Sequence, residues 1–157
     1  MVSVVAQEEA GLLRRAQPGD VSLVLGFIRD FYRVDGHVFN EARLRPALEP
    51  LLRDDRFGVV WLIGQPVGGY AIVTWSYSLE SGGREALLDE IFIAERGHGL
   101  GSAAMRAILD DVAARGIGKM FLETELRNAR AREFYTRAGF DRDDSIWMSC
   151  DPGKRLR

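Results

Sequence analysis

The chain has 157 residues, of which 46% are hydrophobic and 28% charged, and its formal net charge at pH 7 is −2. This length and balance predict one globular domain over residues 1–157 and exclude a protein that mainly neutralises nucleic-acid phosphates, so no nucleic-acid partner is expected. One cysteine, Cys150, and two histidines provide neither a disulfide framework nor a dedicated zinc site, so no metal is expected. No apolar run approaches the about 20 residues of a membrane span, and residues 1–11 lack a secretory pattern. We therefore expect a cytoplasmic protein with no membrane partner.

The first part of the chain predicts a strand followed by two helices. The strand is expected over residues 12–16, after a loosely held start at 1–10. Asp20 is a typical helix N-cap, and the spacing that follows it marks one apolar helix face made of Val24, Phe27, Ile28 and Phe31. The same spacing recurs at Leu44, Ala47, Leu48 and Leu51, although Pro46 and Pro50 are expected to distort or shorten this second helix.

Three strands are expected next, over residues 57–63, 67–79 and 86–93, and the short turns between them make them antiparallel. A helix follows the glycines at 97–101, then a strand over 119–124, a helix capped by Asn128 and closed by Gly139, and a last strand over 146–149. The tail at 151–157 is expected to be loosely held. The fold class is thus α/β (α+β), of order βααβββαβαβ, with a mixed, mostly antiparallel sheet of six to seven strands flanked by about four helices.

A glycine-rich loop at residues 97–101 lies between a predicted strand and a predicted helix. Such loops cradle phosphate, because glycines let the backbone approach the ligand and the helix N-terminus offers free N–H groups. The loop lacks the lysine of a P-loop, and Ser102 stands where the Gly-x-Gly-x-x-Gly pattern of dinucleotide-binding folds requires glycine. A dinucleotide site is therefore poorly supported.

Two motifs resemble those of one enzyme superfamily. The run Arg96-Gly97-His98-Gly99-Leu100-Gly101 matches Arg-x-x-Gly-x-Gly, and Asn128, Ala131, Tyr135 and Gly139-Phe140 match Asn-x-x-Ala-x-x-x-Tyr-x-x-x-Gly-Phe. On these motifs, residues 12–149 resemble the GCN5-related N-acetyltransferase (GNAT) superfamily, of the bacterial small-molecule type. The stretches at 77–79 and 88–93 are similar to its polyamine and thialysine acetyltransferase branch. The resemblance implies the GNAT fold and a homodimer.

The resemblance also implies that acetyl-CoA is the co-substrate, with its pyrophosphate on the glycine loop and no metal. Contacts with acetyl-CoA are implied for the strand residues Ile91, Phe92 and Ile93, for Arg96, Gly97, His98, Gly99, Leu100, Gly101 and Ser102, and for Asn128 and Tyr135. Tyr135 is implied as the general acid toward the coenzyme thiolate. The alternative for Tyr135 is core packing, because it lies on the apolar face of its helix, and the two roles are compatible.

Acetyl transfer to an amine needs a base, because an amine of pKa about 10.4 is almost wholly protonated at pH 7. Asp89 and Glu90 are adjacent carboxylates in an otherwise apolar strand. Since successive strand residues point to opposite faces, only one of them is expected to face a given cleft. Which one acts as the base is open, with a slight preference for Glu90; structural salt bridges are the alternative role.

The acceptor pocket is predicted from aromatic and acidic residues, which suit a cationic amine. The candidates are Phe31, Tyr32, Asp35, His37 and Phe39 after the first helix, and Tyr70, Trp75, Tyr77 and Glu80 on or after the long strand. Ordinary core aromatics and surface charges would give the same pattern. The predicted function is acetyl transfer from acetyl-CoA to a primary amine of a small molecule. Two alternatives stay open, namely a protein or peptide N-acetyltransferase and a non-catalytic acetyl-CoA-binding sensor.

Overall fold

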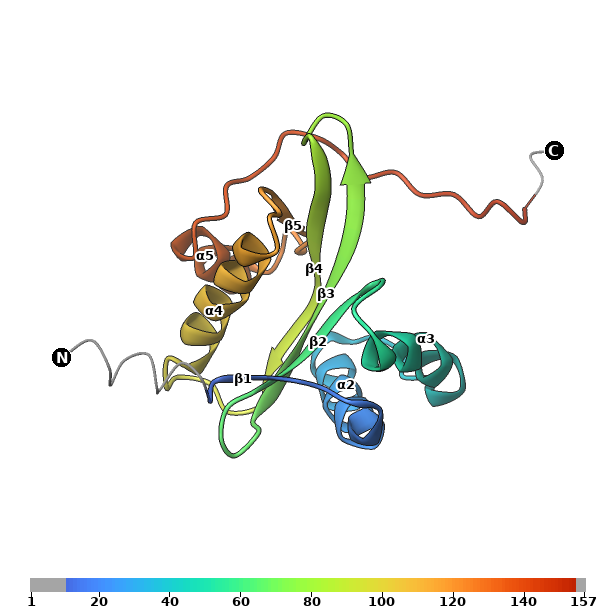
Figure 1. The fold of residues 1–157 in the computed structure, drawn as a ribbon, viewed down its shortest axis with the longest axis vertical. Coiled ribbons are helices and arrows are strands. Elements are labelled where there is room, and N and C mark those ends of the chain that lie inside the picture. The colour runs from blue at the N-terminus through green and yellow to red at the C-terminus, as the bar shows by residue number, and fades with distance from the viewer. Residues whose placement is uncertain (1–10, 155–157) are drawn as a thin grey trace.

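The computed structural model describes residues 11–154, so the predicted loose ends at 1–10 and 155–157 lie outside the described residues. Its core is one five-stranded sheet of order β1-β2-β3-β4-β5, in which only β4 and β5 are parallel (Figure 1). The strands are β1 (Leu13–Arg15), β2 (Gly58–Ile63), β3 (Gly69–Ser78), β4 (Gly83–Ile93) and β5 (Met120–Leu122). The predicted fold class and the mostly antiparallel pairing are confirmed.

In residues 11–154, four α-helices and one 3-10 turn accompany the sheet. They are η1 (Pro18–Asp20), α2 (Val21–Asp35), α3 (Glu41–Arg53), α4 (Leu100–Ala114) and α5 (Ala129–Arg137). Figure 1 shows α2 and α3 on one side of the sheet, and α4 and α5 on the other. The sheet is therefore covered on both faces, and each face has its own hydrophobic core.

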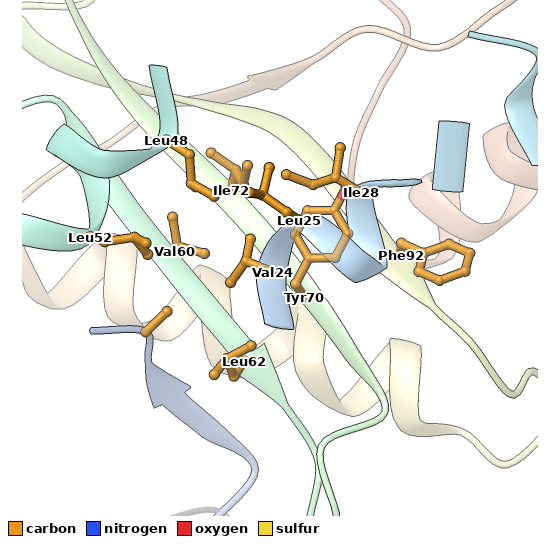
Figure 2. Packing of buried hydrophobic residues seen from close by; sticks show 11 residues of the cluster. Val24, Leu25, Ile28, Leu48, Leu52, Val60, Leu62, Tyr70, Ile72 and Phe92 are labelled. Carbon is orange, nitrogen blue, oxygen red and sulfur yellow. The ribbon is translucent and has the colours of Figure 1, made fainter. Parts of the chain in front are cut away.

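The core under α2 and α3 follows the predicted helical spacing in part, because Ala47 is exposed and the buried Leu25 and Leu52 were not predicted. Val24, Leu25 and Ile28 of α2 are buried against the sheet, together with Leu48 and Leu52 of α3 (Figure 2). The strands contribute Val60, Leu62, Tyr70, Ile72 and Phe92 to the same layer. The opposite layer is built by Ala104, Met105, Ile108 and Val112 of α4.

Helix α3 differs from the prediction, because it runs without interruption from Glu41 to Arg53 although Pro46 and Pro50 lie inside it. The two prolines are four residues apart and therefore lie on one face of the helix. Pro46 is exposed, as is Ala42, whose carbonyl loses its usual partner at Pro46. Water can solvate such a carbonyl, and the buried face with Leu48 and Leu52 holds the helix together.

A β-bulge interrupts β4 beside β3. Leu88 pairs with Val73 and Glu90 pairs with Ile72, so Asp89 has no partner across the ladder. A residue inserted in this way changes which face the side chains on either side of it occupy. Leu88 packs in the core under α4, whereas Phe92 packs in the core under α2.

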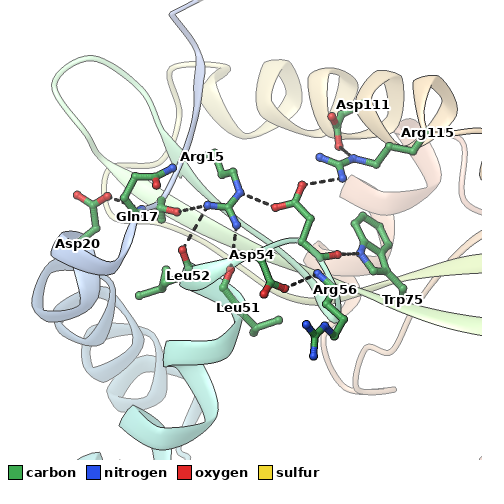
Figure 3. A network of polar contacts seen from close by, with 12 residues as sticks. Arg15, Gln17, Asp20, Leu51, Leu52, Asp54, Arg56, Trp75, Asp111 and Arg115 are labelled. Carbon is green, nitrogen blue, oxygen red and sulfur yellow. Dashed lines mark hydrogen bonds and ion pairs between the residues drawn. The ribbon is translucent and has the colours of Figure 1, made fainter.

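A polar network ties four distant segments together (Figure 3). The Asp55 carboxylate accepts from Arg15 Nε at 2.5 Å and from an Arg115 terminal nitrogen at 2.9 Å. Arg115 also donates to Asp111 at 2.7 Å, and Trp75 Nε1 donates to the Asp55 carbonyl at 2.8 Å. The pKa of Asp55 lies below its usual range because hydrogen bonds from Arg15 and Arg115 outweigh the opposing effect of burial. Asp55 thus joins β1, the segment before β2, β3 and the end of α4.

The predicted last strand over 146–149 is wrong, because residues 141–150 contain no strand. Ile146, Trp147 and Met148 are exposed by 88%, 71% and 91%. A strand needs a paired neighbour, and β propensity alone does not supply one. The sheet therefore has five strands in residues 11–154, fewer than the six to seven expected. None of the helices in this range is long and apolar enough to cross a bilayer.

Candidate active site

A cleft opens where β4 and β5 separate. β5 pairs only with Ala86–Leu88 of β4, so the following stretch Asp89–Ile93 has no strand beside it on that edge. The cleft has a volume of about 1100 Å³ and includes Asp89–Ile93 on one wall and Glu123, Thr124, Glu125 and Asn128 on the other. Ligand sites mostly measure roughly 300–1,000 Å³. This cleft is large enough for a long co-substrate and an acceptor together.

Most of the predicted site residues come together in this cleft. The structure places there Phe31, Tyr32, Asp35, His37, Asp89, Glu90, Ile91, Phe92, Ile93, Arg96, Gly97, Gly99, Leu100, Gly101, Ser102, Asn128 and Tyr135. The other candidates, which do not line the cleft, are Phe39, Tyr70, Trp75, Tyr77, Glu80 and His98. Tyr77 is 73% exposed and lies on β3 at its pairing with Arg84, away from the β4–β5 split, so the structure brings neither Tyr77 nor Glu80 to this cleft.

The glycine loop ends in the N-terminus of α4. Gly97 and Gly99 have φ angles of +97° and +75°, which favour glycine, and Gly99 is the N-cap of the helix. A glycine cap has no side chain to accept from the first N–H groups, and the first turn contains no acidic residue. This end of the helix is therefore suited to an anionic ligand.

Several lining residues were not predicted from the sequence. Arg130 and Arg137 of α5 lie seven residues apart, which places them on the same side of the helix, and both line the cleft with Arg96. That spacing is the signal that could have revealed them. Glu123 and Glu125 also line the cleft, but no periodic pattern marks them because they follow β5 in a loop.

Asp89 and Glu90 both line the cleft, which corrects the expectation that only one of them would. The reason is the bulge, because strict alternation of faces fails at a residue that has no partner across the ladder. The side chain of Glu90 shares the α2 side of the sheet with Tyr70. Asp89 is exposed, and the surrounding protein still raises the pKa of its carboxyl by removing water.

Two tyrosine hydroxyls donate to Glu90, one to each carboxylate oxygen. Tyr32 donates to Oε1 at 2.8 Å and Tyr70 donates to Oε2 at 2.5 Å. Burial raises the pKa of Glu90 above its ordinary value, although the two tyrosine hydrogen bonds act in the opposite direction. Glu90 is thus a partly buried carboxylate whose affinity for a proton is increased. That property suits a general base near neutral pH.

Tyr135 lies on the α5 wall of the cleft and packs edge-on against Phe134 and Phe140, with ring centroids at 5.3 and 6.0 Å. Burial raises the pKa of Tyr135, and the charge of Asp35 raises it further. Its hydroxyl therefore keeps its proton at neutral pH. The ring packs in the core while the residue also lines the cleft, so the two roles considered for it are compatible.

The end of the cleft next to α2 is lined by aromatic and polar side chains. His37 Nε2 lies 2.8 Å from an oxygen of Asp35, and the His37 ring packs against Tyr32 with centroids 5.4 Å apart.

Asn128 caps α5 by accepting from the Ala131 N–H at 3.1 Å, as expected of a helix N-cap. In residues 11–154 no three His, Cys, Asp or Glu side chains gather as a metal site would require.

Comparisons with known proteins agree with this geometry. The model of the Acetyltransferase (GNAT) family matches residues 25–140. A protein of Arthrobacter sp. FB24 described as an acetyltransferase is 29% identical, with a TM-score of 0.74 over 92% of this chain and 96% of its own. An integron cassette protein from the mobile metagenome of Cole Harbour Salt Marsh is 27% identical, with a TM-score of 0.79 over 92% of each chain.

A more distant structure, from Clostridium acetobutylicum, is described as an acetyltransferase with acetyl-CoA. It is 18% identical, with a TM-score of 0.74 over 88% of this chain and 94% of its own, and at this identity it supports the fold. No curated protein matched the chain. The family model covers most of the sequence, including the glycine loop and Tyr135. The chain therefore belongs to the GNAT family of acetyltransferases.

Proposed function

We propose that this acetyltransferase moves the acetyl group of acetyl-CoA directly to a primary amine of a small molecule. The observation that carries the proposal is a single cleft with a glycine-rich helix N-terminus on its wall and, lining the same space, Glu90 and Tyr135. Acetyl-CoA supplies an activated acetyl thioester. The α4 N-terminus, Arg96, Arg130 and Arg137 offer groups that bind its phosphates.

The residues of the chain divide the chemistry between them. Glu90 accepts a proton from the ammonium form of the acceptor, which frees the nitrogen lone pair to form the new N–C bond. The open edge of β4 at Ile91–Ile93 offers a backbone N–H to the thioester oxygen as the C–S bond breaks. The bonded nitrogen loses its second proton to solvent as the C–S bond breaks, and Tyr135 gives its hydroxyl proton to the departing sulfur and regains one from solvent. Glu90 then releases its proton to solvent, so that one proton is released overall. Asp89 is the alternative base, because it lines the same cleft.

A small cationic amine fits the acceptor end. Tyr32, His37 and Phe31 provide aromatic surface, and Asp35 and Glu90 provide negative charge. The narrower assignment to polyamine or thialysine acetylation stays a prediction, as do the homodimer and the cytoplasmic location. The mass of the protein in solution, measured by light scattering, tests the dimer.

The test is release of free thiol from acetyl-CoA in the presence of polyamines, amino acids, aminoglycosides and short peptides. Thermal unfolding with and without coenzyme A is measured alongside. Turnover with a free amine supports the proposal, and turnover with peptides alone replaces it by a protein-directed activity. Stabilisation by coenzyme A without turnover on any acceptor favours a sensor, and no stabilisation at all contradicts the role of the glycine loop.

A further inference from the structure

The two tyrosines bound to Glu90 differ in their surroundings. Tyr70 comes from the central strand β3, has an exposed fraction of 0% and packs near Phe27 and Phe92, with ring centroids 6.3 and 6.5 Å away. Figure 2 shows it enclosed in the core under α2. Tyr32 comes from α2, is half-buried and lines the cleft. One hydroxyl is therefore held by the core, and the other is open to the space where an acceptor would bind.

Because of this difference, the two carboxylate oxygens of Glu90 have different surroundings. Oε2 accepts from the enclosed Tyr70, whereas Oε1 accepts from Tyr32 on the cleft side. A base must offer an oxygen to the proton that it removes, at about 2.6–3.2 Å from the donor. The Tyr32 hydroxyl already occupies such a position at 2.8 Å. An ammonium group that donates to Oε1 makes the same kind of contact and carries a full charge, so its bond is the stronger one.

We propose that Tyr70 is a positioning residue that holds Glu90 in place, and that the Tyr32 hydroxyl occupies the acceptor amine's position on Oε1 until the amine displaces it. The proposal rests on the proposed function, because it assigns Glu90 as the base. It goes further in giving Tyr32 and Tyr70 separate and opposite roles. Tyr70 keeps its bond throughout the reaction, and Tyr32 gives up its bond when the acceptor binds.

The groups that face Glu90 shift its pKa in opposite directions. Asp89 raises the pKa of Glu90, whereas Tyr70, Tyr32 and the charge of His37 lower it. Each phenol donates to the ionised carboxylate and so favours it. Removing either hydroxyl from the free protein therefore raises the pKa of Glu90. Once the acceptor is bound, only removal of the Tyr70 hydroxyl should still have this effect.

The experiment compares Tyr70→Phe and Tyr32→Phe with the wild-type protein. Both variants keep the ring and lose only the hydroxyl. Tyr77→Phe is the matched control, because Tyr77 is exposed and lies outside the cleft. The Glu90 carboxyl is titrated by carbon-13 NMR in glutamate-labelled protein and is assigned by its absence in Glu90→Gln. Thermal unfolding midpoints show whether each variant is folded.

In the free protein, we expect the Glu90 midpoint to rise by about one pH unit in both variants, which is roughly the effect of one hydrogen bond to an ionised group, and to stay unchanged in Tyr77→Phe. This measurement needs no turnover. An unchanged midpoint in folded Tyr70→Phe or folded Tyr32→Phe overturns the role of that tyrosine, whether or not the protein is active.

Kinetics with the best amine of the panel then test the displacement. In the pH profiles, the acid limb of kcat/KM reports the pKa of the base in the free enzyme, and the acid limb of kcat reports its pKa in the bound complex. We expect Tyr70→Phe to move the acid limbs of both kcat/KM and kcat to higher pH. We expect Tyr32→Phe to move only the acid limb of kcat/KM, and its KM for the amine on the pH plateau to be unchanged or lower. A shifted kcat limb or a raised KM in Tyr32→Phe overturns the displacement. If no amine is acetylated, the proposed function and the displacement both fail, and the NMR titration alone decides whether the tyrosines hold Glu90.

Discussion

The glycine loop allows a matched pair of substitutions, Gly99→Ala and Gly101→Ala. Gly99 has a φ of +75°, and a methyl group added there meets nothing within 4 Å, so the cost of alanine is entirely one of backbone conformation. Gly101 lies in the first turn of α4, and its added methyl would contact Phe134 at 3.7 Å, an ordinary van der Waals distance. The two substitutions add the same group at positions two residues apart.

The expected magnitudes follow from these conformations. Alanine in the left-handed region costs about 1–2 kcal/mol, offset by about 0.4–1 kcal/mol because the unfolded chain loses freedom. Gly99→Ala should therefore cost about 1 kcal/mol in total. If the loop keeps its shape without ligand, this cost appears as lower stability. If the loop relaxes, the conformational cost of about 1–2 kcal/mol appears in binding, as a dissociation constant for coenzyme A that is about 5–30-fold higher, while the free protein is stabilised by about 0.4–1 kcal/mol. Gly101→Ala should stabilise the protein by about 0.4–1 kcal/mol and leave binding unchanged.

The assay combines urea unfolding with calorimetric titration of coenzyme A for each variant. For Gly99→Ala, the losses in unfolding and binding free energy should add up to about 1 kcal/mol. The reasoning is refuted if Gly99→Ala changes neither quantity. It is equally refuted if Gly101→Ala weakens coenzyme A binding as much as Gly99→Ala does, because the positive φ at Gly99 would then not matter for the ligand.

Three further predictions concern catalysis and stability. Glu90→Gln should lower kcat/KM by about 10²–10⁴-fold. Because burial raises the pKa of Glu90 in the folded protein, ionisation of Glu90 opposes folding once the pH rises above the ordinary pKa of a glutamate. The stability of Glu90→Gln relative to wild type, measured by urea unfolding, should therefore increase from pH 4 to pH 7. A constant difference would contradict the raised pKa. Tyr135→Phe should lower kcat and leave the affinity for acetyl-CoA largely unchanged, and equal turnover in a steady-state assay would remove Tyr135 from the reaction. Asp55→Asn should cost about 1–2 kcal/mol of stability at pH 7, since it weakens two charged hydrogen bonds at a side chain that is 37% exposed. The folded-state pKa of Asp55 is lowered, so this cost should shrink as pH falls through that pKa; a cost that persists at pH 2 would point to packing instead of charge.

Local patterns were enough to predict most of the elements. The apolar face that includes Val24 and Ile28 predicted α2, and Asn128 predicted the start of α5, where it does accept from the Ala131 N–H. Such signals succeed because helix periodicity and capping depend on residues only three or four positions apart. The prediction of the last strand failed because a strand depends on residues that are distant along the chain. The run from Ile146 to Ser149 has strand-like residues, but a strand exists only when another segment pairs with it.

The candidate cleft shows the same division, because some of its features follow from local sequence and others depend on the tertiary structure. The sequence by itself determined the glycine loop, because positive φ at Gly97 and Gly99 and a helix start at Leu100 are local properties of the backbone. Only the tertiary structure decided that Asp89 and Glu90 share one cleft, because the bulge depends on how β4 pairs with β3. It also decided that Tyr32 and Tyr70 meet at Glu90, 58 and 20 residues away along the chain. Contacts over such separations depend on the packing of α2 against the sheet, which no local pattern encodes.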